Sequence, residues 1–72
     1  MLQLTIERER RGWTRAELAR RAGMHPATVG LIESGRLHPY ERQVAKLARA
    51  LGVAAGDADH LLAKVSGAEG QP

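Results

Sequence analysis

Hydrophobic residues recur along this chain at intervals of three and four, the spacing that gathers side chains on one face of an α-helix. Alternation with a period of two, which would indicate a half-buried β-strand, is nearly absent, and the chain has no Phe. The pattern therefore predicts an all-α protein, a compact bundle of about five short helices around one core. Its clearest helical series lies at Val44, Leu47, Ala48 and Leu51.

Capping residues and glycines set the expected bounds of the first two helices. Leu2 and Ile6 lie one turn apart and indicate a first helix near the start of the chain. Thr14 is the expected N-cap of a second helix, and Glu17, three residues later, completes the sequence of a capping box. Gly23 ends this helix, because glycine adopts the left-handed conformation without a steric penalty.

A short third helix is expected to begin at Pro26, since the first helical position needs no N–H group. His25 stands at the capping position before it. Val29 and Ile32 lie three positions apart, so both are expected to face inward. Residues 36–39 then form a loop.

Two further helices are expected after this loop. The fourth runs from about Tyr40 to Gly52, and Asp57 is the expected cap of a fifth that extends through Leu61 to Val65. The last helix either completes the core, which we favour, or supplies a contact between two copies of the chain.

Length and composition narrow the class of protein. The 72 residues suffice for one small domain, which we expect to cover residues 1–66, ahead of a flexible tail at residues 67–72. The chain has no Cys, which excludes disulfides and cysteine-based zinc sites. Its three histidines, at His25, His38 and His60, lie on different elements. We therefore expect no metal site, no cofactor and, without a nucleophile–His–acid arrangement, no enzyme.

Positive charge is concentrated in the first three quarters of the chain. The net charge of +3 divides into +5 over residues 1–53 and −2 over residues 54–72. Nine of the eleven cations are arginine, whose planar guanidinium suits bidentate contacts with phosphate. This distribution favours a polyanionic partner. No apolar run approaches the roughly 20 residues of a membrane span, and no signal peptide is visible, so we expect a cytoplasmic protein without a membrane partner.

Residues 14–33, TRAELARRAGMHPATVGLIE, resemble the helix-turn-helix of the Xre/Cro family of transcription factors, which are similar to phage repressors. The resemblance extends over residues 2–53. Ala19 stands ten positions before Val29, which lets the two helices cross closely, while Gly23 makes the tight turn between them. The resemblance implies a lambda-repressor-like fold and a sequence-specific DNA-binding regulator of transcription in a prokaryotic or phage-infected cell.

The resemblance also assigns structural roles. In the family, a Glu at the end of the recognition helix pairs with an Arg of the first helix, and Glu33 and Arg8 occupy these positions here. We expect this ion pair to be structural. Trp13 is expected to fill the core beneath the second and fourth helices. Four further arginines are expected to form a solvated face with Glu7 and Glu9: Arg10, Arg11, Arg20 and Arg21.

By the same resemblance, the helix that starts at Pro26 would enter the major groove, and the N-terminus of the preceding helix would face a phosphate. The recognition face departs from the family, because Pro26, Ala27, Gly30 and Leu31 have no hydrogen-bonding side chain, and only Thr28 among them does. The expected DNA contacts are Thr14, Arg15, His25, Pro26, Ala27, Thr28, Leu31, Arg36, His38 and Tyr40.

Two functions from different classes fit these features. The first is a regulator that binds double-stranded DNA, normally as a homodimer on a two-fold operator. The second is an adaptor with the same fold, whose apolar face at Pro26, Ala27 and Leu31 contacts a protein partner. A steep dependence of binding on salt would favour the first of these functions.

Overall fold

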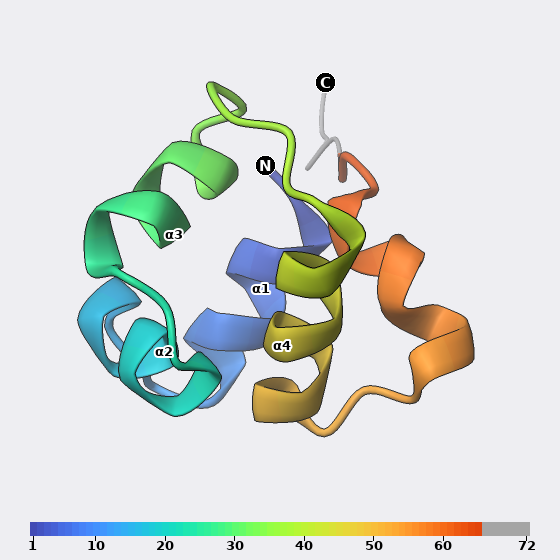
Figure 1. Cartoon of the computed structure of the whole chain (residues 1–72), viewed down its shortest axis with the longest axis horizontal. Coiled ribbons are helices and arrows are strands. Elements are labelled where there is room, and N and C mark those ends of the chain that lie inside the picture. The colour runs from blue at the N-terminus through green and yellow to red at the C-terminus, as the bar shows by residue number, and fades with distance from the viewer. Residues whose placement is uncertain (66–72) are drawn as a thin grey trace.

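The computed structural model describes residues 1–65, so the tail expected at residues 67–72 lies outside the described part of the chain. This part has four α-helices and one 3₁₀ helix, and no strand beyond an isolated β-bridge between Leu2 and Lys64. The predicted all-α bundle with a helix-turn-helix is confirmed. The helices are α1 (Gln3–Arg10), α2 (Arg15–Ala22), α3 (Pro26–Glu33), α4 (Glu41–Leu51) and η1 (Ala55–Leu62), as Figure 1 shows.

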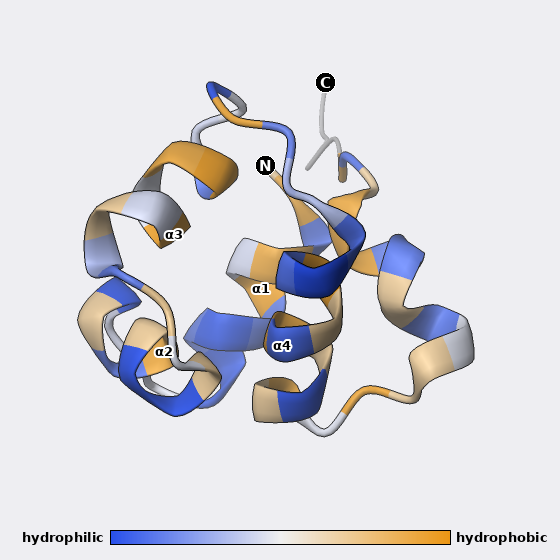
Figure 2. Cartoon of the chain, in the orientation of Figure 1, coloured by the Kyte–Doolittle hydropathy of each residue, from blue (hydrophilic) through white to orange (hydrophobic). Residues whose placement is uncertain are grey.

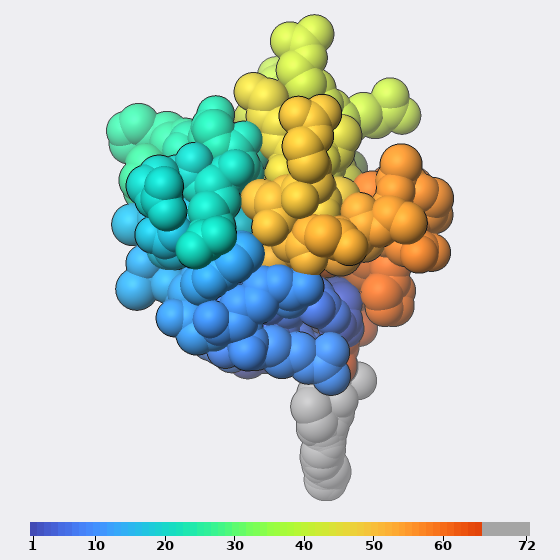
Figure 3. Space-filling model, turned by 90° about the horizontal axis from the view of Figure 1, so that it is seen from below, coloured from blue at the N-terminus to red at the C-terminus, as the bar shows by residue number. Residues whose placement is uncertain are grey.

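The helices surround one core. Helix α2 packs against both α3 and α4, and η1 packs against α4 and α1. The pair α2–α3 therefore lies on one side of α4 and η1 on the other (Figures 1 and 3). No helix within residues 1–65 has the length and apolar character to cross a membrane.

Every helix contributes to the core, as the spacing of apolar residues predicts. The largest fully buried side chains are Leu4, Leu18, Val29, Ile32, Leu47 and Leu61. Hydrophilic residues lie on the outer turns of α4 in Figure 2, on the side away from these leucines. In α1 the buried residues are Leu4, Thr5 and Arg8, whereas Leu2 and Ile6, the pair that indicated this helix, are half-buried.

The ends of α2 follow the local signals in the sequence, with one difference. The Thr14 hydroxyl oxygen accepts a hydrogen bond from the Glu17 N–H at 3.0 Å, and Gly23 ends the helix at φ 69°. The Glu17 side chain does not complete the predicted capping box, because its carboxylate instead accepts hydrogen bonds from Arg20 and Arg21 one turn later. Two cationic partners outcompete the single backbone N–H of the cap.

The last helix is present, but its predicted start and end were wrong, and it is a 3₁₀ helix, a type that the sequence did not specify. Its N-cap is Ala54, and Asp57 lies inside the first turn, where its N–H donates to the Ala54 carbonyl at 2.9 Å. The backbone becomes extended at Ala63, and the Val65 N–H donates to the Met1 carbonyl at 2.7 Å. The chain turns away because Val65 pairs with the N-terminal segment. Leu61, which is 2% exposed, completes the core.

Trp13 does not fill the core as predicted, since it is only half-buried at the edge of the cluster. Its ring packs against the core and also lies close to two guanidinium groups. The Arg21 guanidinium carbon lies 4.2 Å from the ring centroid and that of Arg11 lies 5.8 Å away. Arginine prefers such aromatic faces, which explains why the ring stays at the surface.

Candidate nucleic-acid interface

Helices α2 and α3 pack closely against each other, and a small side chain of α2 is buried where they meet. Ala19 and Val29 are both completely buried, ten residues apart as the spacing predicts. The turn between them passes through Gly23, and the Met24 N–H donates to the Ala19 carbonyl at 2.8 Å. Such a short, hydrogen-bonded turn leaves α3 with one orientation against α2.

Helix α3 begins at the residues that the sequence indicated. His25 is the N-cap, and its Nδ1 accepts a hydrogen bond from the Ala27 N–H at 3.0 Å. Because Nδ1 is occupied, Nε2 is the nitrogen of this exposed imidazole that can meet a ligand. Pro26 follows at the first helical position, where the missing N–H leaves no donor unsatisfied.

The outer face of α3 is apolar. Pro26, Ala27 and Leu31 are exposed, and Leu31 retains 43% of its accessible surface. Thr28 and Gly30 are half-buried beside them. The exposed side chains on this face therefore provide contact surface for methyl groups and no donor or acceptor for base edges.

Beneath this face lies a buried ion pair. The Glu33 side chain is 1% exposed, and it accepts hydrogen bonds from Arg8 Nε to Oε2 at 2.8 Å and from Arg8 Nη2 to Oε1 at 3.1 Å. The remaining Arg8 Nη1 donates to the Trp13 carbonyl at 2.7 Å. The hydrogen bond with Glu33 raises the pKa of Arg8 above its already high ordinary value. This geometry agrees with the pair that the family resemblance implies.

A second arginine also reaches Glu33, which sequence reasoning missed. Arg15 Nε donates to Oε1 of Glu33 at 3.1 Å, while the Arg15 side chain stays 54% exposed. One Nη group of Arg15 lies 3.9 Å from the position that a Cβ on Gly30 would occupy. The contact spans 18 residues, so no local spacing in the sequence could have indicated it.

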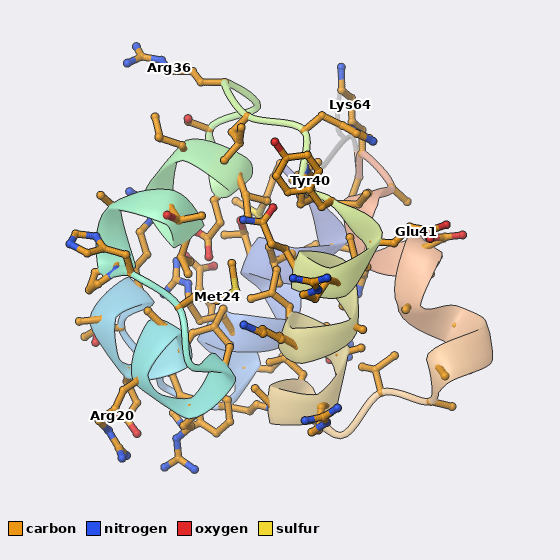
Figure 4. All side chains as sticks on the ribbon, viewed as in Figure 1. Arg20, Met24, Arg36, Tyr40, Glu41 and Lys64 are labelled. Carbon is orange, nitrogen blue, oxygen red and sulfur yellow. The ribbon has the colours of Figure 1, made fainter. Side chains whose placement is uncertain are left out.

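The loop after α3 carries exposed polar side chains. Arg36 points away from the body of the protein, as Figure 4 shows, and Tyr40 retains 77% of its accessible surface at the start of α4. His38 is exposed between them, whereas Pro39 is buried and anchors the loop. The Arg36 N–H donates to the Leu31 carbonyl at 2.9 Å, which ties the loop to the end of α3.

Arg20 lies at the other end of the α2–α3 pair from Arg36 (Figure 4). Its guanidinium binds the Glu17 carboxylate, and so does that of Arg21. The hydrogen bond from Arg20 lowers the pKa of Glu17 below its ordinary value, and the one from Arg21 adds to this shift. The predicted face of four arginines around Glu7 and Glu9 is thus divided among residues 1–65: Arg20 and Arg21 pair with Glu17 on their own helix, whereas Glu7 pairs with Arg10 and Arg11.

Comparison with known proteins decides the family. A family model described as a helix-turn-helix domain matches residues 2–61, most of the chain. This chain belongs to the helix-turn-helix domain family. Neither a curated protein nor a solved structure matches it. The match is consistent with the Xre/Cro-type resemblance of residues 14–33.

Membership of the helix-turn-helix family indicates a DNA-binding regulator in general, and domains of this family are typically non-enzymatic. No group of three His, Cys, Asp or Glu residues in the described part of this helix-turn-helix domain could hold a metal ion. Its surface at α3 and the following loop carries apolar, cationic and aromatic side chains, since Leu31, Arg36 and Tyr40 are exposed.

Within this helix-turn-helix domain, the ten residues expected to contact DNA differ in their exposure and in whether their polar atoms already have a partner. Thr14 already uses its hydroxyl oxygen as the cap of α2, and Thr28 is half-buried. The structure leaves nine of the ten residues exposed along the start of α2, α3 and the following loop: Thr14, Arg15, His25, Pro26, Ala27, Leu31, Arg36, His38 and Tyr40.

Proposed function

We propose that this helix-turn-helix protein is a sequence-specific DNA-binding transcriptional regulator of the Xre/Cro type. Helix α3, Pro26–Glu33, enters the major groove, and the N-terminus of α2 faces a phosphate. The observation that carries this proposal is the fixed α2–α3 crossing, with Ala19 and Val29 completely buried and the face of α3 left exposed. The protein acts in the cytoplasm of a prokaryotic or phage-infected cell.

The charges around α3 support the same function. Arg36 and Tyr40 are exposed on the loop that follows α3, where their donors can contact the sugar-phosphate backbone. Arg15 is exposed at the start of α2, and its guanidinium binds Glu33 at the end of α3. Apolar Ala27 and Leu31 on α3 suit contacts with thymine methyl groups.

Selection from a random pool of DNA duplexes at about 150 mM salt, followed by sequencing, tests this function. We expect an enriched motif, and two symmetric half-sites about 10 base pairs apart if the regulator binds as a homodimer. An enriched single half-site would keep the regulator and exclude the homodimer. An unenriched pool would contradict sequence-specific binding.

An Arg36→Gln variant makes the test sharper, because it removes one exposed cation beside α3. We expect weaker binding to all sequences alike, with the slope of log affinity against log salt reduced by about one. Arg20→Gln is the matched control, since Arg20 is also exposed but lies at the other end of the α2–α3 pair and already binds Glu17 (Figure 4). This control should change the slope less than Arg36→Gln.

A second candidate function is a protein-interaction adaptor, and one observation favours it. The exposed face of α3 at Pro26, Ala27 and Leu31 lacks the hydrogen-bonding side chains that base readout normally uses. An adaptor would bind DNA only at low salt and would saturate with one protein partner. The uncharged substitution Leu31→Gln would then abolish partner binding while leaving the weak, low-salt DNA binding in place.

A further inference from the structure

We propose that Arg15 of α2, rather than a side chain of α3, reads a guanine base in the major groove. Glu33 and Gly30 act as positioning residues that hold the Arg15 guanidinium against α3 for this contact. The inference rests on the proposed function, in which α3 enters the groove, and it names the base that the site selects.

The exposed face of α3 cannot itself make this selection. Pro26, Ala27 and Leu31 are exposed and carry no side-chain donor or acceptor. The bidentate contact with a guanine edge, the commonest specific contact, uses two donors for its O6 and N7 atoms, whereas the exposed His25 Nε2 at the start of α3 offers one. A guanidinium does lie beside the middle of α3, because Nη1 of Arg15 is 3.9 Å from the position of a Cβ on Gly30.

Glu33 holds the guanidinium of Arg15 through the Nε atom of Arg15. Nε of Arg15 donates to Oε1 of Glu33 at 3.1 Å, and Glu33 is itself held by two hydrogen bonds from Arg8. This contact uses Nε and leaves the two Nη groups, which form the edge that pairs with O6 and N7 of guanine. The side chain is 54% exposed, so this edge is accessible to a ligand.

Gly30 provides the space in which the guanidinium lies. Apart from its chain neighbours and the backbone of α3 itself, the one atom of residues 1–65 within 4 Å of a Cβ built on Gly30 is Nη1 of Arg15, at 3.9 Å. An alanine there would make an ordinary van der Waals contact, whereas a longer side chain would occupy the place of the guanidinium. The position therefore accommodates glycine or alanine but excludes a longer side chain, although glycine is an unfavourable helix former inside α3.

Orientation favours a base over a phosphate as the ligand. A phosphate accepts hydrogen bonds over a wide range of directions, so a mobile arginine binds it well. A guanine edge demands two coplanar donors in register, and a guanidinium held by Glu33 against α3 meets this demand at a lower entropic cost.

The positioning can be tested without DNA, by NMR of the Arg15 Nε–H group. We expect this proton to be protected from exchange in the wild type and in Gly30→Ala. In Gly30→Leu we expect the protection to be lost, with the helical circular dichroism of the domain retained. An unprotected proton in the folded wild type, or one still protected in Gly30→Leu, would overturn the positioning.

Selection from the random duplex pool tests whether Arg15 selects guanine. It uses five proteins: wild type, Arg15→Lys, Gly30→Leu, Gly30→Ala and Arg20→Lys. The wild type should select guanine at one position of each half-site. Arg15→Lys and Gly30→Leu should lower that preference about ten- to a hundred-fold and keep the other positions. Gly30→Ala and Arg20→Lys, the matched controls, should keep the whole motif.

The outcomes separate this inference from the function on which it rests. If the wild type selects a motif that Arg15→Lys leaves unchanged, the regulator stands and the guanine contact is wrong. An Arg15→Gln variant that weakens binding to every sequence equally would identify a phosphate contact instead. If the wild type selects nothing, both proposals fail together.

Discussion

The carboxylates of Glu33 and Glu17 each bind two arginines, but in opposite surroundings. The Glu33 side chain is 1% exposed and binds Arg8 and Arg15, from 25 and 18 residues away along the chain. The Glu17 side chain is 29% exposed and binds Arg20 and Arg21, three and four residues away on the same helix. Each cluster joins one carboxylate to two guanidinium groups. The two clusters therefore differ in the burial of the carboxylate and in the separation of the partners along the chain.

The comparison teaches which ion pairs depend on the fold. The Glu17 pairs lie on neighbouring turns of α2, so they can form in the isolated helix and add little to the free energy of folding. The Glu33 pairs exist only when α1, α2 and α3 have packed. Once Glu33 is buried, its charge must keep a partner, because an unpaired buried carboxylate is strongly destabilising.

Removal of the buried partner is the strongest test of this difference. We expect Arg8→Ala to destabilise the domain by about 3–5 kcal/mol, because Glu33 loses two hydrogen bonds while remaining buried. Since a domain of this size rarely has more than about 5 kcal/mol of stability, the variant should be largely unfolded. Urea unfolding followed by circular dichroism measures the effect.

Arg10→Ala is the matched control, since Arg10 lies on the same helix with its side chain 69% exposed and bound to Glu7. It should unfold close to the wild-type midpoint. An Arg8→Ala protein as stable as this control would mean that Arg15 alone satisfies Glu33, and the contrast between the two clusters would then disappear.

Acid should weaken the exposed pairs gradually. Hydrogen bonds from Arg11 and from Gln3 lower the pKa of Glu7, and those from Arg20 and Arg21 lower the pKa of Glu17, both from an ordinary value of 4.5. A carboxylate with a lowered folded pKa contributes stability above its unfolded pKa, and this contribution is lost as pH falls through the folded value.

We therefore expect the thermal midpoint to fall as pH drops below about 4.5, and to fall less steeply in a Glu7→Gln, Glu17→Gln double variant. Thermal unfolding monitored by circular dichroism between pH 7 and pH 2 gives both slopes. Equal slopes in the two proteins would show that these exposed pairs contribute nothing to the acid response.

The smallest effect is expected from Glu17→Gln alone at neutral pH. The substitution removes both ion pairs of the exposed cluster, yet water screens them and the Thr14 cap of α2 remains. The thermal midpoint should shift several-fold less than in Arg8→Ala and should depend on salt. A loss comparable to that of Arg8→Ala would contradict the distinction between local and long-range pairs.

Much of the fold could be predicted from short stretches of sequence. Thr14, Gly23 and His25 act at helix ends through contacts with residues two to four positions away, and their chemistry indicates the same ends in the structure. The family resemblance likewise placed Arg8 opposite Glu33. The start of η1 was missed because Asp57 has the character of a cap, whereas the packing of Leu61 and the pairing of Val65 with Met1 decide where this segment lies.

The sequence indicated which residues of the candidate site would be exposed, but it did not indicate which of them would contact one another. The sequence indicated that α3 carries an apolar face and that Arg36 and Tyr40 follow it, and these residues are exposed. The sequence did not indicate that Arg15 donates a hydrogen bond to Glu33 or that its guanidinium lies next to Gly30. That contact requires the crossing angle of α2 and α3, which no pattern of local spacing contains.

The sequence by itself determined an all-helical domain with a helix-turn-helix, because helix periods, caps and turn glycines act over a few residues. Only the tertiary structure decided the role of each arginine. Residues of one type, similar in the sequence, became a buried partner at Arg8, an anchored and accessible group at Arg15, and members of local pairs at Arg20 and Arg21. The physical reason is that charge interactions depend on burial and distance in space, which exist only after the helices have packed.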